Sequence, residues 1–323
     1  MASLIGSLGR CLDYARLSIT DRCNLRCRYC MPEEGIPWIA HDDILTYEDV
    51  LFLIDILQDL GIRKIRITGG EPLVRKGIAS FLAMLKPTFP NLRFALTTNG
   101  ILLEKYAEIL VDAGFSGVNV SLDTLDPEKF TFVTRGGDLR QVFRGIARAA
   151  SVGISIKINT VLIQGFNDGE ILPLLEYARE IGALLRFIEF MPLDGDVWSE
   201  GRFLPAEIIL QRLPEPDMWH FIEKKDHSEG PAMYLRHEKT AQRIGIIAAV
   251  THHFCDTCNR LRFSADGEIR SCLFSRKGTS LFLPLRTRER NAVKELIVRV
   301  AQEKPRCWKD LLDGERHMSR IGG

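Results

Sequence analysis

The sequence predicts an α/β protein, a partial (β/α)6 barrel similar to a TIM barrel, followed by a C-terminal α+β region. Three observations support this prediction. Short apolar runs, typical of buried parallel strands, alternate with longer segments of helical period in six successive units. Glycines close several of the helical segments, where a positive φ is often needed. After about residue 213 the alternation stops and turn-rich, β-like runs follow.

The barrel is expected to occupy residues 1–213. Its strands are predicted at 15–19, 64–68, 93–97, 118–122, 155–161 and 184–189. Helices are predicted at 47–60, capped by Thr46, at 102–113, at 139–152, and at 169–181, capped by Asp168. Six units fit a partial barrel better than the eight of a complete one. A doubly wound open sheet is the alternative, because periodicity alone does not separate the two.

The C-terminal region is expected to span residues 214–323. Strands are predicted at 243–247, 261–264 and 268–270, the last two joined by a turn at Asp266-Gly267, and a helix is predicted at 287–304. We expect this region to pack on the barrel.

The charge balance excludes some classes of partner. The 323 residues include 43 Lys and Arg and 42 Asp and Glu, a net charge of +1. A groove for a nucleic-acid backbone usually needs a stronger positive balance, whereas one small anion needs only a few convergent arginines. The sequence has no apolar run of the ~18 residues that a membrane helix needs, and its first ten residues do not resemble a secretory signal. We therefore expect a cytoplasmic protein without membrane or nucleic-acid partners.

The first of two cysteine motifs directly follows the first predicted strand. Cys23, Cys27 and Cys30 form C-x3-C-x2-C in a loop that would lie at the catalytic end of a parallel sheet. Three thiolates at this spacing indicate a metal centre. A structural zinc site requires four protein ligands, whereas a [4Fe–4S] cluster on three cysteines keeps one iron open. The spacing favours iron–sulfur over zinc, and a redox dithiol is the third alternative.

The second motif, C-x2-C-x13-C, consists of Cys255, Cys258 and Cys272. Taken alone it slightly favours zinc, since His252 or His253 could complete a Cys3His set. Beside a first iron–sulfur motif, a second cluster with an open iron becomes the stronger interpretation. Cys11 and Cys307 belong to neither motif and are interpreted as ordinary thiols.

Two family resemblances follow from these motifs. The first motif, with Tyr29 before its last cysteine, and the segment Gly69-Gly70-Glu71-Pro72 after the second strand resemble the radical SAM superfamily. The second motif, the phrases CNRLR and RFIEFMP, and the terminal Gly-Gly resemble the GTP 3′,8-cyclase family over essentially the whole chain.

The resemblance implies two [4Fe–4S] clusters and S-adenosylmethionine as cofactors. In that family a 5′-deoxyadenosyl radical abstracts hydrogen from C3′ of GTP, and the new radical attacks C8 of guanine. The product is (8S)-3′,8-cyclo-7,8-dihydroguanosine 5′-triphosphate, the first committed intermediate of molybdenum cofactor biosynthesis.

The resemblance also implies site residues. Those expected around S-adenosylmethionine are Tyr29, Gly70, Glu71, Ser121 and Met191. Those expected to bind GTP are Arg16, Arg66, Thr97, Lys157, Arg186, Arg260, Leu261 and Arg262. The tail residues Gly322 and Gly323 are expected to enter the active site and assist catalysis. No other residue receives a catalytic role, and Asp123 and Asp126 are interpreted as turn and cap residues.

Charged residues on the predicted strands agree with an anionic substrate. Arg16, Arg66, Lys157 and Arg186 each lie on a different strand. A cation on a buried strand is costly unless an anion meets it, and a triphosphate would satisfy several at once. The alternative for each is an acidic neighbour, for instance Glu189 for Arg186. Four cations together favour an anionic ligand.

The same resemblance implies partners. These are GTP as substrate, an electron donor such as flavodoxin or ferredoxin, and the downstream cyclic pyranopterin monophosphate synthase. A homodimer is one compatible assembly. Two other functions fit parts of the pattern, namely a radical SAM peptide-maturing enzyme with an auxiliary cluster and a structural zinc protein.

Overall fold

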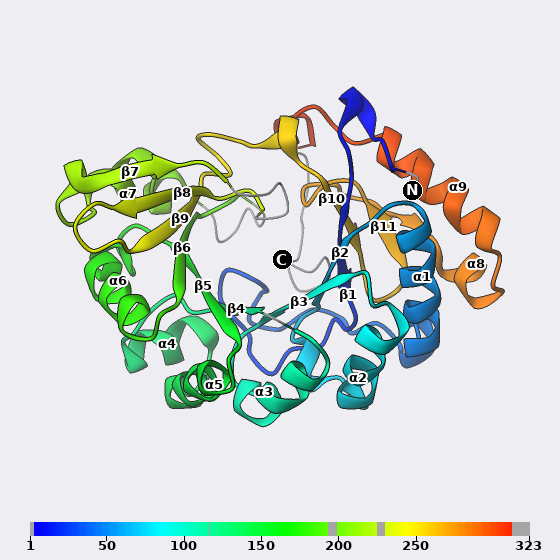
Figure 1. Cartoon of the computed structure of the whole chain (residues 1–323), viewed down its shortest axis with the longest axis horizontal. Coiled ribbons are helices and arrows are strands. Elements are labelled where there is room, and N and C mark those ends of the chain that lie inside the picture. Colours follow the sequence, from blue (N-terminus) through cyan, green and yellow to red (C-terminus); the bar gives the residue numbers. More distant parts are fainter. Residues whose placement is uncertain (1–2, 116, 193–198, 225–229, 312–323) are drawn as a thin grey trace.

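A computed structural model describes residues 3–115, 117–192, 199–224 and 230–311 (Figure 1). The described strands form one twelve-stranded sheet in the order β12-β11-β10-β1-β2-β3-β4-β5-β6-β9-β8-β7. The strands are β1 Tyr14–Ser18, β2 Lys64–Thr68, β3 Arg93–Thr98, β4 Gly117–Ser121, β5 Ser155–Leu162, β6 Leu184–Glu189, β7 Trp219–Ile222, β8 Met233–His237, β9 Arg243–Ile247, β10 Arg260–Phe263, β11 Glu268–Arg270 and β12 Thr279–Ser280. The helices are α1 Tyr47–Asp59, α2 Ile78–Thr88, α3 Leu103–Asp112, α4 Pro127–Thr134, α5 Leu139–Ser151, α6 Ile171–Glu180, α7 Ala206–Gln211, α8 Phe282–Arg286 and α9 Arg290–Gln302.

The centre of the sheet is parallel and confirms the predicted partial barrel. Strands β1 to β6 pair in chain order, each parallel to the next. Figure 1 shows the sheet as an open arch, with helices α1 to α6 along its outer side. The apolar faces of these helices and of the strands form one large core between sheet and helices.

The C-terminal strands extend the same sheet at both edges. Strand β9 pairs parallel with β6, and β10 pairs parallel with β1. Strands β8 and β7 then add antiparallel beyond β9, and β11 and β12 add antiparallel beyond β10. Both edges of the arch are therefore made by residues after 213, which brings the second cysteine motif beside the first strand.

Most predicted elements lie within one or two residues of their positions in the structure. Thr46 caps α1 in a capping box with Asp49, as its residue type suggests. The glycines that were expected to end helices, Gly61, Gly114, Gly153 and Gly182, all have positive φ.

Three details of the helices differ from the prediction. Asp168 is not the N-cap of α6, which begins at Ile171; its carboxylate instead accepts from the backbone N–H of Gly165 and pairs with Arg212. Helices α2 and α4 were not predicted. Helix α2 begins after Gly77 in the left-handed conformation and contains Pro87, so it lacks the usual start signal and carries a residue that breaks helices.

None of the helices in the described part of the chain is long and apolar enough to span a bilayer.

Candidate active site

A cavity of about 230 Å³ lies on the inner side of the arch, many times the roughly 10–15 Å³ that one water needs. Its described lining carries eight cationic side chains, namely Arg16, Lys64, Arg66, Lys157, Arg186, Arg260, Arg262 and Lys304. The one carboxylate among these described lining residues is Asp123. Such an excess of positive charge in an enclosed space is suited to a polyanion.

Three of the arginines lie at the same level on adjacent strands. Arg262 on β10 and Arg66 on β2 are both in register with Arg16 on β1. Like charges directly opposite each other destabilise a sheet. Burial, together with neighbouring arginines, lowers the pKa of Arg16 to about 10 and holds the pKa of Arg262 well below its usual value. An anion bound here would relieve this repulsion.

Arg186, on β6, is buried and incompletely paired. Its Nε and Nη2 atoms have no hydrogen-bond partner among the described residues, and its exposed fraction is 5%. Burial, and then the charge of Arg66, lowers its pKa to about 10. The alternative that Glu189 serves Arg186 is wrong, since both Glu189 oxygens accept from the backbone or hydroxyl groups of other residues, including Ala206 and Thr251.

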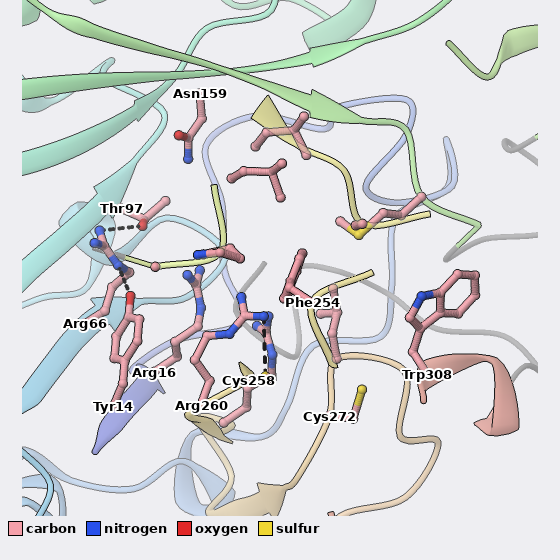
Figure 2. Close-up of a pocket in the computed structure, with 18 of the residues that line it drawn as sticks. Tyr14, Arg16, Arg66, Thr97, Asn159, Phe254, Cys258, Arg260, Cys272 and Trp308 are labelled. Atoms are coloured by element: carbon pink, nitrogen blue, oxygen red, sulfur yellow. Dashed lines mark hydrogen bonds between the residues drawn. The ribbon is translucent and has the colours of Figure 1, made fainter. Parts of the chain in front are cut away.

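Tyr14 is a lining residue that the sequence analysis did not identify. The Nε of Arg66 donates to its hydroxyl, and Nη1 of Arg66 donates to the Leu96 carbonyl at 2.9 Å and to Thr97 Oγ1 at 3.3 Å (Figure 2). Burial raises the pKa of Tyr14, but the charges of Arg66, Arg16 and Lys64 outweigh it and lower the pKa to about 6. Tyr14 therefore acts as an internal counter-ion for these cations.

The first cysteine motif lies in the loop after β1, as predicted. Burial, and then the neighbouring Cys30 thiol, raises the pKa of Cys27 well above its usual range, so the thiols of the motif lie close enough to influence one another. The pKa of Cys23 rises to about 11 through burial. The hydroxyl of Tyr29 donates to Asp123 Oδ2 at 2.6 Å, which links this loop to the end of β4.

The Gly69-Gly70-Glu71 segment packs against the start of the cysteine loop and hydrogen-bonds to it. The N–H of Gly70 donates to the Thr20 carbonyl, and the N–H of Glu71 donates to the Arg22 carbonyl, both at 2.8 Å. A Cβ on Gly70 would lie 2.5 Å from the Arg22 oxygen, closer than atoms can pack. The glycine is therefore required for the cysteine loop to pack against the end of β2.

The carboxylate of Glu71 is used inside the protein. It is fully buried and accepts from the backbone N–H groups of Leu73 and Asn99 and from Thr98 Oγ1. Burial raises its pKa to about 7 despite these bonds. It does not line the cavity in the described structure, so its observed role is to hold the loops that follow β2 and β3.

The second cysteine motif lines the opposite side of the cavity. Figure 2 shows Cys258 and Cys272 near Arg260, and Nη2 of Arg260 lies 3.5 Å from the Cys258 sulfur. Burial raises the pKa of Cys258, but Arg260 and Lys304 outweigh it and lower the pKa to about 6. The thiolate form favoured here is the form that binds metals. The Nζ of the buried Lys304 donates to the carbonyls of Arg260 and Ser271 and ties this motif to the chain after α9.

The structure brings together most of the expected site residues. Those that line the cavity are Arg16, Tyr29, Arg66, Thr97, Ser121, Lys157, Arg186, Met191, Cys255, Cys258, Arg260, Arg262 and Cys272. Those outside the cavity lining are Cys23, Cys27, Cys30, Gly70, Glu71 and Leu261. The side chain of Leu261 is fully buried in the core between sheet and helices, because side chains alternate along β10. Gly322 and Gly323 lie outside the described residues.

The lining residues that the sequence analysis missed follow a simple period. Tyr14 and Lys64 each precede a predicted strand cation by two positions, and Asn159 and Val161 continue the same face from Lys157. In a strand, residues two apart point to the same side. Extending each strand by this rule would have found them. Asn119, Asp123, Phe254 and Trp308 also line the cavity and were not predicted.

Comparison with known proteins identifies the family of this chain. The chain matches the Radical SAM superfamily over residues 17–178 and the Molybdenum Cofactor Synthesis C family over residues 183–309. A GTP 3′,8-cyclase from Peptoclostridium acidaminophilum is 44% identical over 99% of this chain and 98% of its own length. Another from Thermodesulfovibrio yellowstonii is 42% identical over 98% of this chain and 99% of its own. This chain belongs to the GTP 3′,8-cyclase family of radical SAM proteins.

A solved structure shows the same fold in a longer protein. The chain matches the crystal structure of Streptococcus suis SuiB bound to S-adenosylmethionine with a TM-score of 0.63 and 17% identity, over 85% of this chain and 64% of that one. At this identity the likeness concerns the fold alone. Membership of the radical SAM superfamily implies a [4Fe–4S] cluster and S-adenosylmethionine as cofactors.

Proposed function

We propose that this protein converts GTP to (8S)-3′,8-cyclo-7,8-dihydroguanosine 5′-triphosphate, the first step of molybdenum cofactor biosynthesis, as its relatives' name implies. One observation of the structure carries the proposal. A cavity with eight cations and one carboxylate in its described lining lies between a loop with three cysteines and a second group of three cysteines. A nucleoside triphosphate matches that charge.

In this proposal Cys23, Cys27 and Cys30 hold the first cluster. The open iron would bind S-adenosylmethionine, with Tyr29, Gly70, Glu71, Ser121 and Met191 around the cofactor. When bound, this pair supplies the 5′-deoxyadenosyl radical. The chain's own contribution is to shape the loop, since Gly70 allows it to pack on β2 and Asn99 lies 3.7 Å from the Cys23 sulfur. Tyr29, Ser121 and Met191 line the cavity, which supports a contact between them and the cofactor.

The triphosphate would be held by the cations on the strands. Arg16, Arg66 and Arg262 form a row across three strands, Lys157 and Arg186 come from β5 and β6, and Arg260 begins the same strand as Arg262. Arginine offers two parallel donors to phosphate oxygens, so several arginines fix the position as well as the charge of the ligand. Thr97, already oriented by Arg66, would add a hydroxyl. Leu261 would contribute through its main chain, since its side chain lies in the core.

The second motif would hold a second [4Fe–4S] cluster on Cys255, Cys258 and Cys272, all three of which line the cavity proposed for GTP. The spacing of the thiols supports this over one zinc ion. Four ligands at about 2.3 Å around zinc lie about 3.8 Å apart. Within the described residues, neither motif has all three sulfur atoms within 4.8 Å of one another, so each leaves room for a larger group. His252, one candidate fourth zinc ligand, has its Nε2 at 2.6 Å from Glu207.

Metal analysis and GTP binding test the proposal together. Protein purified without oxygen should contain about eight irons and eight sulfides per chain, as two [4Fe–4S] clusters require. The variants Arg260→Ala and Arg262→Ala should lose cyclisation and GTP affinity while they keep all of the iron. Arg236→Ala, at an exposed position of β8, is the matched control and should behave as wild type. Normal turnover of GTP by both cavity variants would contradict the nucleotide assignment.

The remaining elements of the proposal concern partners. A flavodoxin or ferredoxin would supply the electron, and cyclic pyranopterin monophosphate synthase would consume the product. The reaction would take place in the cytoplasm, with a homodimer as one compatible assembly. Gly322 and Gly323 would assist catalysis, since glycine has no side chain to obstruct a crowded cavity.

A further inference from the structure

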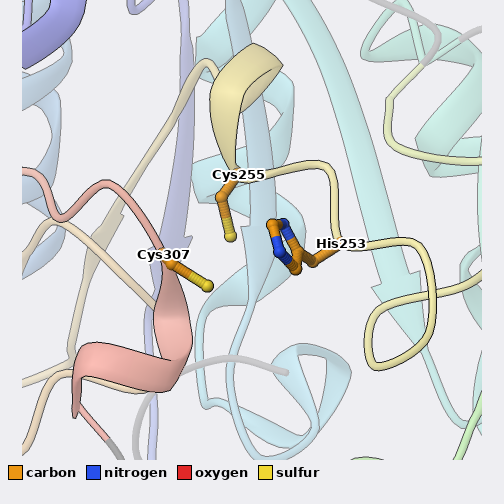
Figure 3. Close-up of side chains that lie close together, drawn as sticks. All are labelled: His253, Cys255 and Cys307. Carbon is orange, nitrogen blue, oxygen red and sulfur yellow. The ribbon is translucent and has the colours of Figure 1, made fainter.

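A third metal-binding set lies beside the second cysteine motif. Cys307, which belongs to neither motif, lies close to Cys255 and His253 in the structure. The two sulfur atoms and a ring nitrogen of His253 all lie within 4.8 Å of one another. Figure 3 shows the two thiols and the imidazole converging on one point from two separate segments of the chain.

Buried contacts hold the two cysteine segments together. Nη1 of Arg10 donates to the carbonyls of Cys255 at 2.9 Å and Pro305 at 3.0 Å, so one guanidinium connects both segments. The backbone N–H of Trp308 donates to the Cys255 sulfur. Both cysteines also pack against the stacked rings of Phe274 and Trp308. The approach of Cys307 to Cys255 is therefore part of the packed structure.

The donor set fits a borderline-soft divalent cation. Two thiolates and one imidazole are preferred ligands of Zn²⁺, and a set of three protein ligands keeps a fourth position open. Tetrahedral zinc requires neighbouring ligands about 3.8 Å apart, so atoms already within 4.8 Å need only small movements to bind it. Of the cysteine and histidine groups in the described chain, this set alone meets that spacing.

Exposure and hydrogen bonding leave the site accessible. His253 is exposed, and the two cysteines are partly exposed. No described residue hydrogen-bonds to the ring of His253, in contrast to His252 and its partner Glu207. A cation can reach the set from solvent and keep a water in the fourth position.

We propose that His253, Cys255 and Cys307 form a Cys2His site for Zn²⁺. The site shares Cys255 with the second three-cysteine motif. Because one thiolate cannot serve both groups, zinc binding and loading of a cluster on that motif exclude each other. The zinc site itself is independent of the proposed function, whereas the competition rests on the second cluster that forms part of it.

Cobalt is a direct probe of the site. The full-length chain, produced without iron loading and kept reduced, is titrated with Co²⁺ and then with Zn²⁺. We expect one tetrahedral Co²⁺ per chain, with a charge-transfer band for two thiolates, that Zn²⁺ removes. Cys307→Ser should halve the thiolate-to-cobalt band. Both Cys307→Ser and His253→Ala should weaken Co²⁺ binding more than about 100-fold. Loss of a residue that only orients a metal ligand already lowers metal affinity about 10- to 100-fold.

Matched variants separate this set from the three-cysteine motif. Cys258→Ser and Cys272→Ser remove thiols of the motif and should leave Co²⁺ binding unchanged, and Cys11→Ser controls for an exposed thiol elsewhere. If Cys258→Ser or Cys272→Ser abolishes binding while Cys307→Ser does not, the motif holds the ion and the proposal is wrong. The proposal is also wrong if the chain binds no tetrahedral Co²⁺ although its circular dichroism matches that of the cluster-loaded protein and therefore shows that it is folded.

Competition can be measured on the loaded protein. Anaerobic protein with both clusters is titrated with Zn²⁺ while released iron is followed. Wild type should release about four irons per chain, the content of one cluster, whereas Cys307→Ser and His253→Ala should keep theirs. Equal release of iron from wild type and both variants would exclude Cys255 as a ligand shared by the cluster and the zinc ion. If GTP binding is normal and zinc has no effect, the inference fails while the proposed function stands.

Discussion

Arg186 gives a prediction in which stability and binding change in opposite directions. Replacement by methionine, Arg186→Met, removes the charge and keeps an unbranched side chain that extends about as far as the arginine Nε. The cost of the native arginine follows from its pKa. Burial lowers that pKa from its usual value to about 10, and the difference corresponds to about 3 kcal/mol at ~1.36 kcal/mol per pKa unit. The folded, ligand-free protein carries this cost at every pH below about 10, because only there is the guanidinium charged in both states.

The expected gain in stability is smaller than the full cost. Arg186→Met also loses the hydrogen bond to Tyr234, about 1 kcal/mol. The net gain is then about 2 kcal/mol, which for a chain of 323 residues raises Tm by about 3 °C. GTP binding should weaken by about 100-fold or more. This loss of binding free energy is about 3 kcal/mol. It is the low end of the range expected for two charge-assisted hydrogen bonds donated by Nε and Nη2.

The assay measures both quantities on the same preparations. Thermal unfolding of anaerobic, cluster-loaded protein gives Tm without ligand, and calorimetry gives the Kd for GTP. Arg236→Met, at an exposed position of β8, is the control and should change neither value. A lower Tm for Arg186→Met without ligand would refute the reasoning, because it would mean that protein groups already satisfy the guanidinium.

Two further predictions concern the first motif and the counter-ion. Gly70→Ala should lower the iron content from about eight to about four per chain, because its Cβ would lie 2.5 Å from the Arg22 oxygen and displace the cysteine loop. Unchanged iron would argue against that clash. Gly201→Ala is the control, because a Cβ there has nothing near it and the backbone does not have a positive φ. Tyr14 should be a phenolate at pH 7.5 without ligand and a phenol once GTP occupies the cavity. The ¹³C chemical shift of the Tyr14 Cζ atom reports this change, and Tyr14→Phe assigns the signal. The pKa of Tyr14 is about 6 in the folded protein, and its usual value is 10. Relative to Tyr14→Phe, ligand-free wild type should therefore gain stability as pH rises from about 6 to 10. Parallel plots of unfolding free energy against pH for the two proteins would contradict this.

The barrel strands could be predicted because each is short, apolar and followed by a clear helix signal. Thr46 and Gly61 delimit α1 by residue type alone. Helix α2 has no such signals, since Gly77 offers no side-chain cap and Pro87 lies within its last turn. Its apolar face, which packs against the core, is what stabilises it, and packing is not visible in a local pattern.

The placement of the C-terminal strands could not be predicted for a related reason. The register of Arg260 with Tyr14 joins residues that are about three quarters of the chain length apart. Nothing in the local sequence of β10 or β9 specifies that one adds beside β1 and the other beside β6. The same long-range geometry explains Cys307, which has no motif around it in the sequence and lies near Cys255 through tertiary contacts, among them those of Arg10 with both segments.

Net charge was a poor guide to where the charges of the protein lie. The chain is nearly neutral, yet the described cavity lining has eight cations and one carboxylate. Many acidic residues instead pair on the outer side of the arch, as Asp49 does with Arg286 and Arg288. The repulsion among these cations, which Tyr14 offsets only in part, would be reduced further by a bound anion. Ligand binding must then stabilise the fold, by about 2.7 kcal/mol when GTP is present at 100 times its Kd. A strong dependence of Tm on GTP follows directly from the way that the sheet gathers these arginines.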